Sequence, residues 1–104
     1  MGNKYGARRT WSELCQREFA SKREAQRGEE LALLERAGEI HTLQYQPKYI
    51  LCEKPRITYA ADFFYVDIKN ARTVVEDVKG VLTRETRVKL AWLKEQQGVG
   101  VELV

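Results

Sequence analysis

Two short apolar segments in the middle of the chain each carry an acid where a buried strand would place an apolar residue. Residues 59–66 read YAADFFYV, and residues 74–80 read VVEDVKG. Side chains alternate between the two faces of a strand, so Asp77 and Lys79 project to the same side. Buried strands exclude charged side chains unless the charges are paired or bind a metal. The pattern therefore indicates a sheet that contains a charged site.

The segments are close enough in the sequence to form an antiparallel hairpin. If Lys69 and Asn70 form the turn, Asp62 faces Asp77, and directly opposed side chains have Cβ atoms about 5 Å apart. Two carboxylates at that distance repel, and a divalent cation such as Mg²⁺ would remove the repulsion because it takes carboxylate oxygens as ligands. The alternative is a different register, in which the acids separate and Asp77 pairs with Lys79 or an arginine.

A helix is predicted from Ser21 to about Ala37. Ser21 and Glu24 have the spacing of a capping box, and Gly38 follows the last turn as a helix-ending glycine. The side expected to be buried carries small and apolar residues, namely Ala25, Gly28, Leu31, Ala32, Leu34 and, as an open alternative, Leu33.

Residues 40–51 read as an extended segment interrupted by Pro47. A second helix is predicted from Thr83 to about Gln97, followed by a strand over residues 99–104. The resulting order, α-β-β-β-α-β, predicts an α/β fold with a mixed central sheet flanked by helices. The face of the second helix that shows helical spacing comprises Val88, Ala91, Trp92 and Glu95.

Several segments along the chain, taken in order, resemble one known family. They are NKYGA (3–7), FASKREA (19–25), LLERAGEI (33–40), LQYQP (43–47), ITYAADF (57–63) and VEDVKG (75–80). The series is similar to small phage and prophage proteins with the PD-(D/E)XK nuclease core, which are described as endonucleases or Holliday-junction resolvases. It also resembles the endonuclease subunit of some transposases, in which a Ser-x-x-Glu helix start precedes the catalytic strands.

The resemblance implies a restriction-endonuclease-like core and a DNA endonuclease that depends on Mg²⁺ or Mn²⁺. Asp62, Asp77 and Glu24 are the implied metal ligands, and Lys79 completes the catalytic set by orienting or deprotonating the attacking water. Branched or junction DNA in phage recombination or packaging is the implied substrate. Cutting two symmetric strands would require a homodimer.

Three positions depart from the family pattern. Ala61 stands where the superfamily name has proline, and Gly28 falls in mid-helix where a bulkier residue is usual. Residues 11–17 lack an expected glycine turn. The wider segment 10–19 fits either a short helix capped by Ser12 or the extended or hairpin segment that the resemblance favours.

The roles of two glutamates, Glu24 and Glu76, are considered separately from those of the aspartates. Glu24 has two interpretations that can coexist: it holds the helix start as part of the capping box, or it completes the metal site. Glu30, nearly two turns further along, is the reserve candidate for the helix acid. Glu76 points away from Asp77 in a regular strand, so we expect it to be structural or partner-facing.

The 104 residues predict one domain, with residues 1–9 as a flexible basic arm. Cys15, Cys52 and the single histidine, His41, lack the spacing of a zinc site, and reduced thiols in a bacterial host cytoplasm are expected. The net charge of +3 suits a polyanionic partner. Side chains that could bind DNA phosphates, or lie on solvated helix faces, are Lys22, Arg23, Arg27, Arg84, Arg87 and Lys89.

Two rival functions remain open. One is a catalytically silent nucleic-acid-binding module that retains the nuclease fold. The other is a nuclease that acts on RNA.

Overall fold

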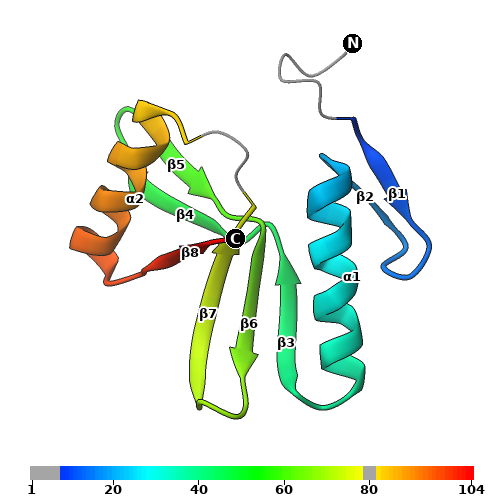
Figure 1. Cartoon of the computed structure of the whole chain (residues 1–104). Coiled ribbons are helices and arrows are strands. Elements are labelled where there is room, and N and C mark those ends of the chain that lie inside the picture. Colours follow the sequence, from blue (N-terminus) through cyan, green and yellow to red (C-terminus); the bar gives the residue numbers. More distant parts are fainter. Residues whose placement is uncertain (1–7, 79–81) are drawn as a thin grey trace.

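A four-stranded mixed sheet forms the centre of the molecule (Figure 1). The computed structural model describes residues 8–78 and 82–104. Strand β7 pairs antiparallel with β6 and parallel with β8, while β3 pairs antiparallel with β6. The predicted fold class, an α/β fold with a mixed central sheet and two helices, is confirmed. In spatial order the strands are β3 (Ile40–Tyr45), β6 (Phe63–Asp67), β7 (Arg72–Asp77) and β8 (Val101–Leu103).

Helix α1 (Lys22–Arg36) lies beside β3, and a hairpin of β1 (Thr10–Ser12) and β2 (Arg17–Phe19) packs on the other side of the helix (Figure 1). The predicted helix start is confirmed, because the Ser21 hydroxyl accepts a hydrogen bond from the Glu24 backbone N–H at 3.1 Å.

The hairpin over residues 10–19 is also confirmed. Gln16 adopts a φ of 53° in its turn and so takes the place of the missing glycine. The glycine in the middle of α1 has a packing reason: a Cβ at Gly28 would lie 2.7 Å from the Phe19 ring. The hairpin can approach α1 this closely only because residue 28 has no side chain.

The opposite face of the sheet is covered by helix α2 (Arg84–Gln97) and a second hairpin, formed by β4 (Lys48–Cys52) and β5 (Ile57–Ala60). Thr83 caps α2 through a hydrogen bond from the Thr86 backbone N–H, and Gly98 ends it with a φ of 71°. Both ends of the helix therefore lie where the sequence predicts them. Neither of the helices in the described ranges is long and apolar enough to cross a membrane.

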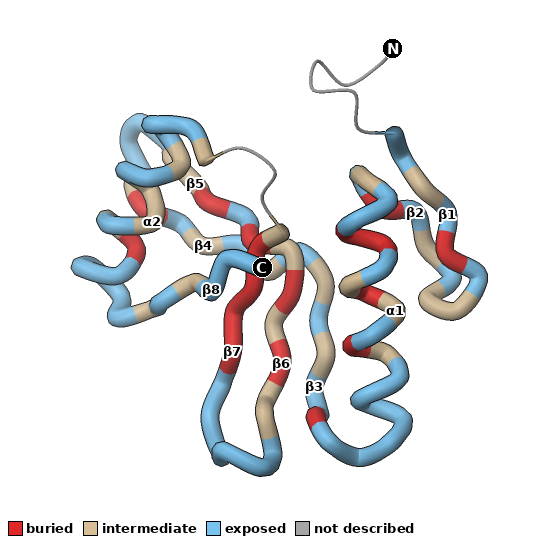
Figure 2. Tube along the Cα trace, viewed as in Figure 1, coloured by how far each residue is buried: buried red, intermediate tan, exposed pale blue. Residues whose placement is uncertain are grey.

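Each face of the sheet has its own apolar core, and Figure 2 shows buried positions along β6 and β7 between them. The core under α1 contains Phe19, Ala25, Leu31, Ile40, Phe63, Tyr65 and Val74. The core under α2 contains Leu51, Tyr59, Ala61, Val75 and Leu93. The alternation of Phe63 and Phe64 between the two cores confirms that the sheet is packed on both sides.

The predicted buried side of α1 is wrong in part. Leu33 and Leu34 on α1 are 54% and 37% exposed, because the sheet does not extend under that part of the helix surface. On α2 the buried residue is Leu93, whereas Val88 is 55% exposed. Among the residues at helical spacing, Val88, Ala91, Trp92 and Glu95, only Trp92 packs against the core.

The hairpin register is confirmed, because Phe64 pairs with Val75 and Tyr65 pairs with Val74. The loop between β6 and β7 has Lys69 and Asn70 at its centre, where the Ala71 N–H donates to the Ile68 carbonyl at 3.2 Å. The prediction of one continuous strand over residues 59–66 is wrong. This segment bends at Ala61 and Asp62, so that β5 pairs with β4 and only β6 joins the central sheet.

Candidate functional site

Asp62 lies at the bend between the two hairpins, just before β6. The backbone on both sides is fixed, since the Asp62 N–H donates to the Glu76 carbonyl at 3.0 Å and the Asp62 carbonyl accepts from the Gln46 N–H at 2.9 Å. Its carboxylate accepts a 2.7 Å hydrogen bond from the Val78 backbone N–H. The bend therefore directs the Asp62 side chain toward the C-terminal end of β7.

Asp77 is the last residue of β7 and is 1% exposed. The hydroxyl of Tyr59, on β5, donates a hydrogen bond to its carboxylate. Burial, followed by this hydrogen bond and the charge of Asp77, raises the pKa of Tyr59 above its ordinary range. Tyr59 consequently stays protonated at neutral pH and holds the Asp77 carboxylate in one orientation.

The Asp62 and Asp77 carboxyl groups lie within hydrogen-bonding reach of each other, and Glu24 is close enough for its charge to act on Asp62. Burial is the largest cause that raises the pKa of Asp62, to about 8, followed by the hydrogen bond with Asp77; the Val78 N–H opposes the shift. Glu24 is itself 7% exposed, on the first turn of α1. The three acids that the sequence predicts as metal ligands therefore lie near one another.

The described residues contain no group of three carboxylate, imidazole or thiol side chains already arranged to hold a metal ion. Lys79, the remaining member of the predicted catalytic set, lies outside the described residues. Asp62 and Asp77 remain the candidate pair of ligands, with Glu24 near enough for its charge to act on Asp62.

A second acidic side chain, Glu76, is buried on the opposite face of β7 at 1% exposure. The Arg27 guanidinium donates to both of its oxygens, at 2.8 Å and 2.6 Å, and the Tyr65 hydroxyl donates to one of them. The hydrogen bond to Glu76 is the largest cause that raises the pKa of Arg27 above its ordinary value. Arg27 was predicted as a DNA-binding residue, but its charge is directed inward to Glu76, and we give it a structural role.

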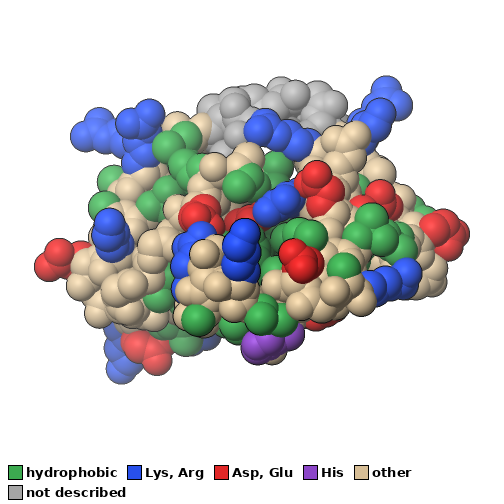
Figure 3. Space-filling view, turned by 60° about the horizontal axis from the view of Figure 1, so that its bottom comes forward, with side chains coloured by type: hydrophobic (Ala, Val, Ile, Leu, Met, Phe, Trp, Pro, Cys, Tyr) green, Lys and Arg blue, Asp and Glu red, His purple; other side chains and the backbone are tan. Residues whose placement is uncertain are grey.

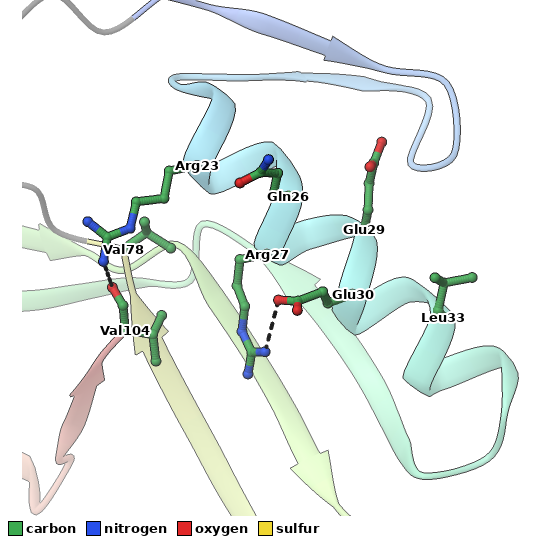
Figure 4. A pocket seen from close by; sticks show the side chains of 8 residues that line it. All are labelled: Arg23, Gln26, Arg27, Glu29, Glu30, Leu33, Val78 and Val104. Atoms are coloured by element: carbon green, nitrogen blue, oxygen red, sulfur yellow. Dashed lines mark hydrogen bonds and ion pairs between the residues drawn. The ribbon is translucent and has the colours of Figure 1, made fainter.

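Glu30, the reserve candidate, is exposed and contacts Arg27 at 3.4 Å rather than the two aspartates. Figure 4 shows both side chains in a groove of about 640 Å³ beside α1, with Arg23 reaching from the first turn of the helix to the Val104 carbonyl at 3.2 Å. Val78, the neighbour of Asp77, also lines this groove. Asp62, Asp77 and Glu24 are not among the residues that line the groove, which lies on the side of β7 that carries Glu76.

The other predicted cations occupy two places. Lys22 and Arg23 are exposed on the first turn of α1, immediately before Glu24, whereas Arg84, Arg87 and Lys89 lie on α2. On the face drawn in Figure 3, basic side chains are interspersed with acidic ones rather than gathered in one patch. The face drawn in this figure therefore carries no continuous cationic surface.

Sequence reasoning missed the two tyrosines that orient the acids. A signal was present, because a tyrosine in a buried strand needs a hydrogen-bond partner for its hydroxyl. In the predicted register, Tyr65 is the diagonal neighbour of Glu76 on the same face. Tyr59 lies beyond the bend that the sequence did not reveal, so its contact with Asp77 could not be derived in the same way.

The fold and the site define a small α/β protein with a pair of acids, oriented by a tyrosine and a backbone N–H, at one end of its central sheet. The chain belongs to the family described as "Protein of unknown function (DUF1064)", whose model matches residues 2–98. No curated protein matches the chain, and no solved structure matches it.

Acidic pH is expected to stabilise the metal-free protein. The folded-state pKa of Asp62 lies above its ordinary value of 3.8, so the native state binds this proton more tightly than the unfolded state. Unfolding free energy should then fall as the pH rises from about 4 through about 8. Urea unfolding in EDTA at pH 5 and pH 9 measures this difference.

The variant Asp62→Asn isolates the contribution of this group. The amide oxygen can still accept from the Val78 N–H, so the change removes the charge but keeps the bond. We expect the variant to be more stable than wild type at pH 9, by on the order of 2 kcal/mol, and to lose most of the pH dependence. An unchanged pH profile would show that Asp62 does not titrate in this way.

Proposed function

We propose that this protein is a metal-dependent endonuclease of the PD-(D/E)XK type that hydrolyses DNA phosphodiester bonds. The observation that carries the proposal is the meeting of Asp62 and Asp77 at the end of β7, with Glu24 of α1 beside them. The two aspartates come from the strands that the sequence singled out. The register of β6 and β7 brings the two acids to the same end of the hairpin, which supports the interpretation that they share a cation.

The chemistry of this set of side chains fits Mg²⁺ or Mn²⁺. Like charges buried at short range need a proton or a cation to offset their repulsion, and carboxylate oxygens are the ligands that these hard cations prefer. Asp62 and Asp77 would hold the ion, and Glu24 would complete the set. A bound divalent cation would neutralise the phosphate charge and lower the pKa of a water molecule.

The protein's own groups fix the orientation of the acids. The Tyr59 hydroxyl holds Asp77, and the Val78 N–H holds Asp62, so neither carboxylate has to be ordered when substrate arrives. Lys79 follows Val78 and remains the predicted residue for orienting or deprotonating the attacking water, with its placement outside the described residues.

Branched or junction DNA of a phage or prophage is the proposed substrate. A junction has two symmetric strands to cut, and a homodimer would present one acidic pair to each. This choice of substrate rests on the resemblance of the sequence to resolvase-like proteins. The alternative is an RNA substrate.

The proposal is tested by incubating the purified protein with labelled plasmid, linear duplex, four-way junction and single-stranded RNA. Each substrate is given Mg²⁺, Mn²⁺ or EDTA. We expect cleavage of DNA with either metal and none in EDTA, with the junction cut fastest. Binding of DNA without cleavage under any of these conditions would instead support the catalytically silent module, which the deep burial of Asp77 also fits.

The hydroxyl of Tyr59 is expected to act through Asp77 rather than on the substrate. Tyr59→Phe removes only the hydrogen bond to Asp77, so Mn²⁺ affinity should fall by about 10–100-fold, as when an outer partner of a metal ligand is lost. Titration calorimetry with Mn²⁺ measures the change. Tyr49→Phe, on the adjacent strand β4, is the matched control and should bind Mn²⁺ like wild type; equal affinity in both variants would remove Tyr59 from the site.

A further inference from the structure

A second hollow, of about 670 Å³, lies between the start of β1 and the start of α1. The two segments meet near the point where the described part of the chain begins, at the upper end of α1 in Figure 1. None of the described residues that line the hollow is acidic. They are Arg8, Arg9, Thr10, Trp11, Ser21, Lys22 and Arg23.

The four cations in this hollow are exposed, and two of them have contacts within the protein that a ligand would have to replace. Arg23 donates to the Val104 carbonyl at 3.2 Å. Arg9 contacts Glu18 at 2.8 Å, but both side chains are about half exposed or more, and such surface pairs contribute little. Lys22 and Arg23 lie in the first turn of α1, where the positive end of the helix dipole disfavours them. An anion bound at this helix start would be stabilised by the dipole and by both side chains.

Trp11 gives the hollow a second kind of binding surface. Its side chain is 55% exposed on a short strand, although a tryptophan is among the largest apolar surfaces that folding can bury. An exposed aromatic ring surrounded by cations matches a nucleic-acid strand, because a base can stack on the ring while the flanking phosphates contact the cations. A paired duplex hides its base faces within the stack and cannot use the ring in this way.

The hollow also adjoins the groove beside α1. Arg23 lines both this hollow and the groove that contains Val78, the residue next to Asp77. Glu24, which follows Arg23, acts on Asp62. A strand that lay in the hollow could therefore continue past the helix start toward the two aspartates.

We propose that this hollow binds an unpaired stretch of nucleic acid, with one base stacked on Trp11 and phosphates held by Arg8, Lys22 and Arg23. The substrate class that follows is DNA with a single-stranded segment next to the bond that is cut, such as a flap, a bubble or an open branch. This link to cleavage rests on the nuclease function proposed above, whereas the binding itself does not.

The fluorescence of Trp11 itself can report whether a nucleic acid binds in the hollow. The chain has two tryptophans, so Trp92→Phe leaves Trp11 as the only one. This protein, in EDTA, is titrated with a single-stranded oligonucleotide and with the same sequence as a duplex. We expect saturable quenching of Trp11 emission by the single strand and at least about tenfold weaker binding of the duplex.

Two further variants show whether the named side chains are responsible. Trp11→Ala should lower affinity for the single strand by about 5–100-fold, the effect of losing one stacked base. In the Trp92→Phe protein, Arg8→Ala/Lys22→Ala should weaken binding by a similar factor. Arg36→Ala/Lys94→Ala removes the same charge from exposed positions on the last turns of the two helices and should have little effect.

Equal losses in the two double variants, or quenching that is as strong with duplex or with anionic lipid vesicles, would overturn the proposal. So would cleavage of junction DNA by a protein whose Trp11 emission does not respond to any single strand. Quenching by the single strand without cleavage of any substrate would uphold the binding site and refute the nuclease instead.

Discussion

Replacing Asp77 with asparagine is expected to reduce metal-dependent DNA cleavage by on the order of 10²–10³-fold. The change keeps the shape of a buried side chain that is 1% exposed, but it removes half of the charge that the acidic pair offers to a cation. Loss of one well-placed electrostatic group from a catalytic site has an effect of this size. Initial rates on labelled junction DNA with Mg²⁺ measure it.

Asp67→Asn is the matched control, because Asp67 ends β6 at the opposite end of the same hairpin. Its carboxylate accepts hydrogen bonds from the backbone N–H and the side-chain amide of Asn70, in the turn between β6 and β7. We expect near wild-type cleavage from this variant. Full activity in Asp77→Asn, or an equal loss in Asp67→Asn, would contradict the assignment of the site.

Replacing Arg27 with methionine is expected to destabilise the fold by about 3–5 kcal/mol. The change leaves the Glu76 carboxylate, at 1% exposure, without its cationic partner, and an uncompensated buried charge has a cost of this size. Within the described residues, the hydroxyl of Tyr65 would then be the remaining donor to Glu76. The midpoint and slope of urea unfolding measure the loss.

The double variant Arg27→Met/Glu76→Gln tests the reason for this loss. Removing the charge of Glu76 as well should restore part of the stability, because the cost comes from the unpaired carboxylate rather than from the missing arginine. Arg36→Met, at an exposed position of the same helix, is the control and should change stability by less than about 0.5 kcal/mol. A loss below about 1 kcal/mol in Arg27→Met would show that the pair is not a structural element.

The sequence predicted the hairpin of β6 and β7 because the residues that determine this hairpin lie close together in the chain. Alternating apolar residues and a short turn fix the pairing of Phe64 with Val75, and that register brings Asp62 and Asp77 to the same end of the hairpin. The helix ends followed in the same way from Ser21, Gly38, Thr83 and Gly98, whose side chains or backbone angles satisfy the terminal hydrogen bonds.

The bend at Asp62 could not be predicted from local pattern. Residues 59–66 alternate like one strand, but Ala61 donates its N–H to the Pro47 carbonyl while Asp62 bonds to Glu76, so the two neighbours belong to different sheets. Only long-range pairing with β4 decides this. The buried side of α2 was missed for a similar reason, because Val88 and Leu93 are both apolar and the hairpin beneath the helix decides which one is buried.

The sequence likewise did not predict that Arg27 is the partner of Glu76. Arg27 is one of several cations on α1, and its spacing resembles that of a solvated helix face. The contact with Glu76 depends on how α1 packs against the sheet, which no residue near either position encodes. The acid itself was correctly expected to face away from Asp77.

The most direct measurement of the central claim is anomalous scattering from a crystal of the protein grown with Mn²⁺. The account predicts a peak between the Asp62 and Asp77 carboxylates, with an oxygen of each at about 2.0–2.5 Å from the ion. A crystal structure in which the two aspartates keep their hydrogen bonds within the protein, and no manganese lies between them, would contradict the account.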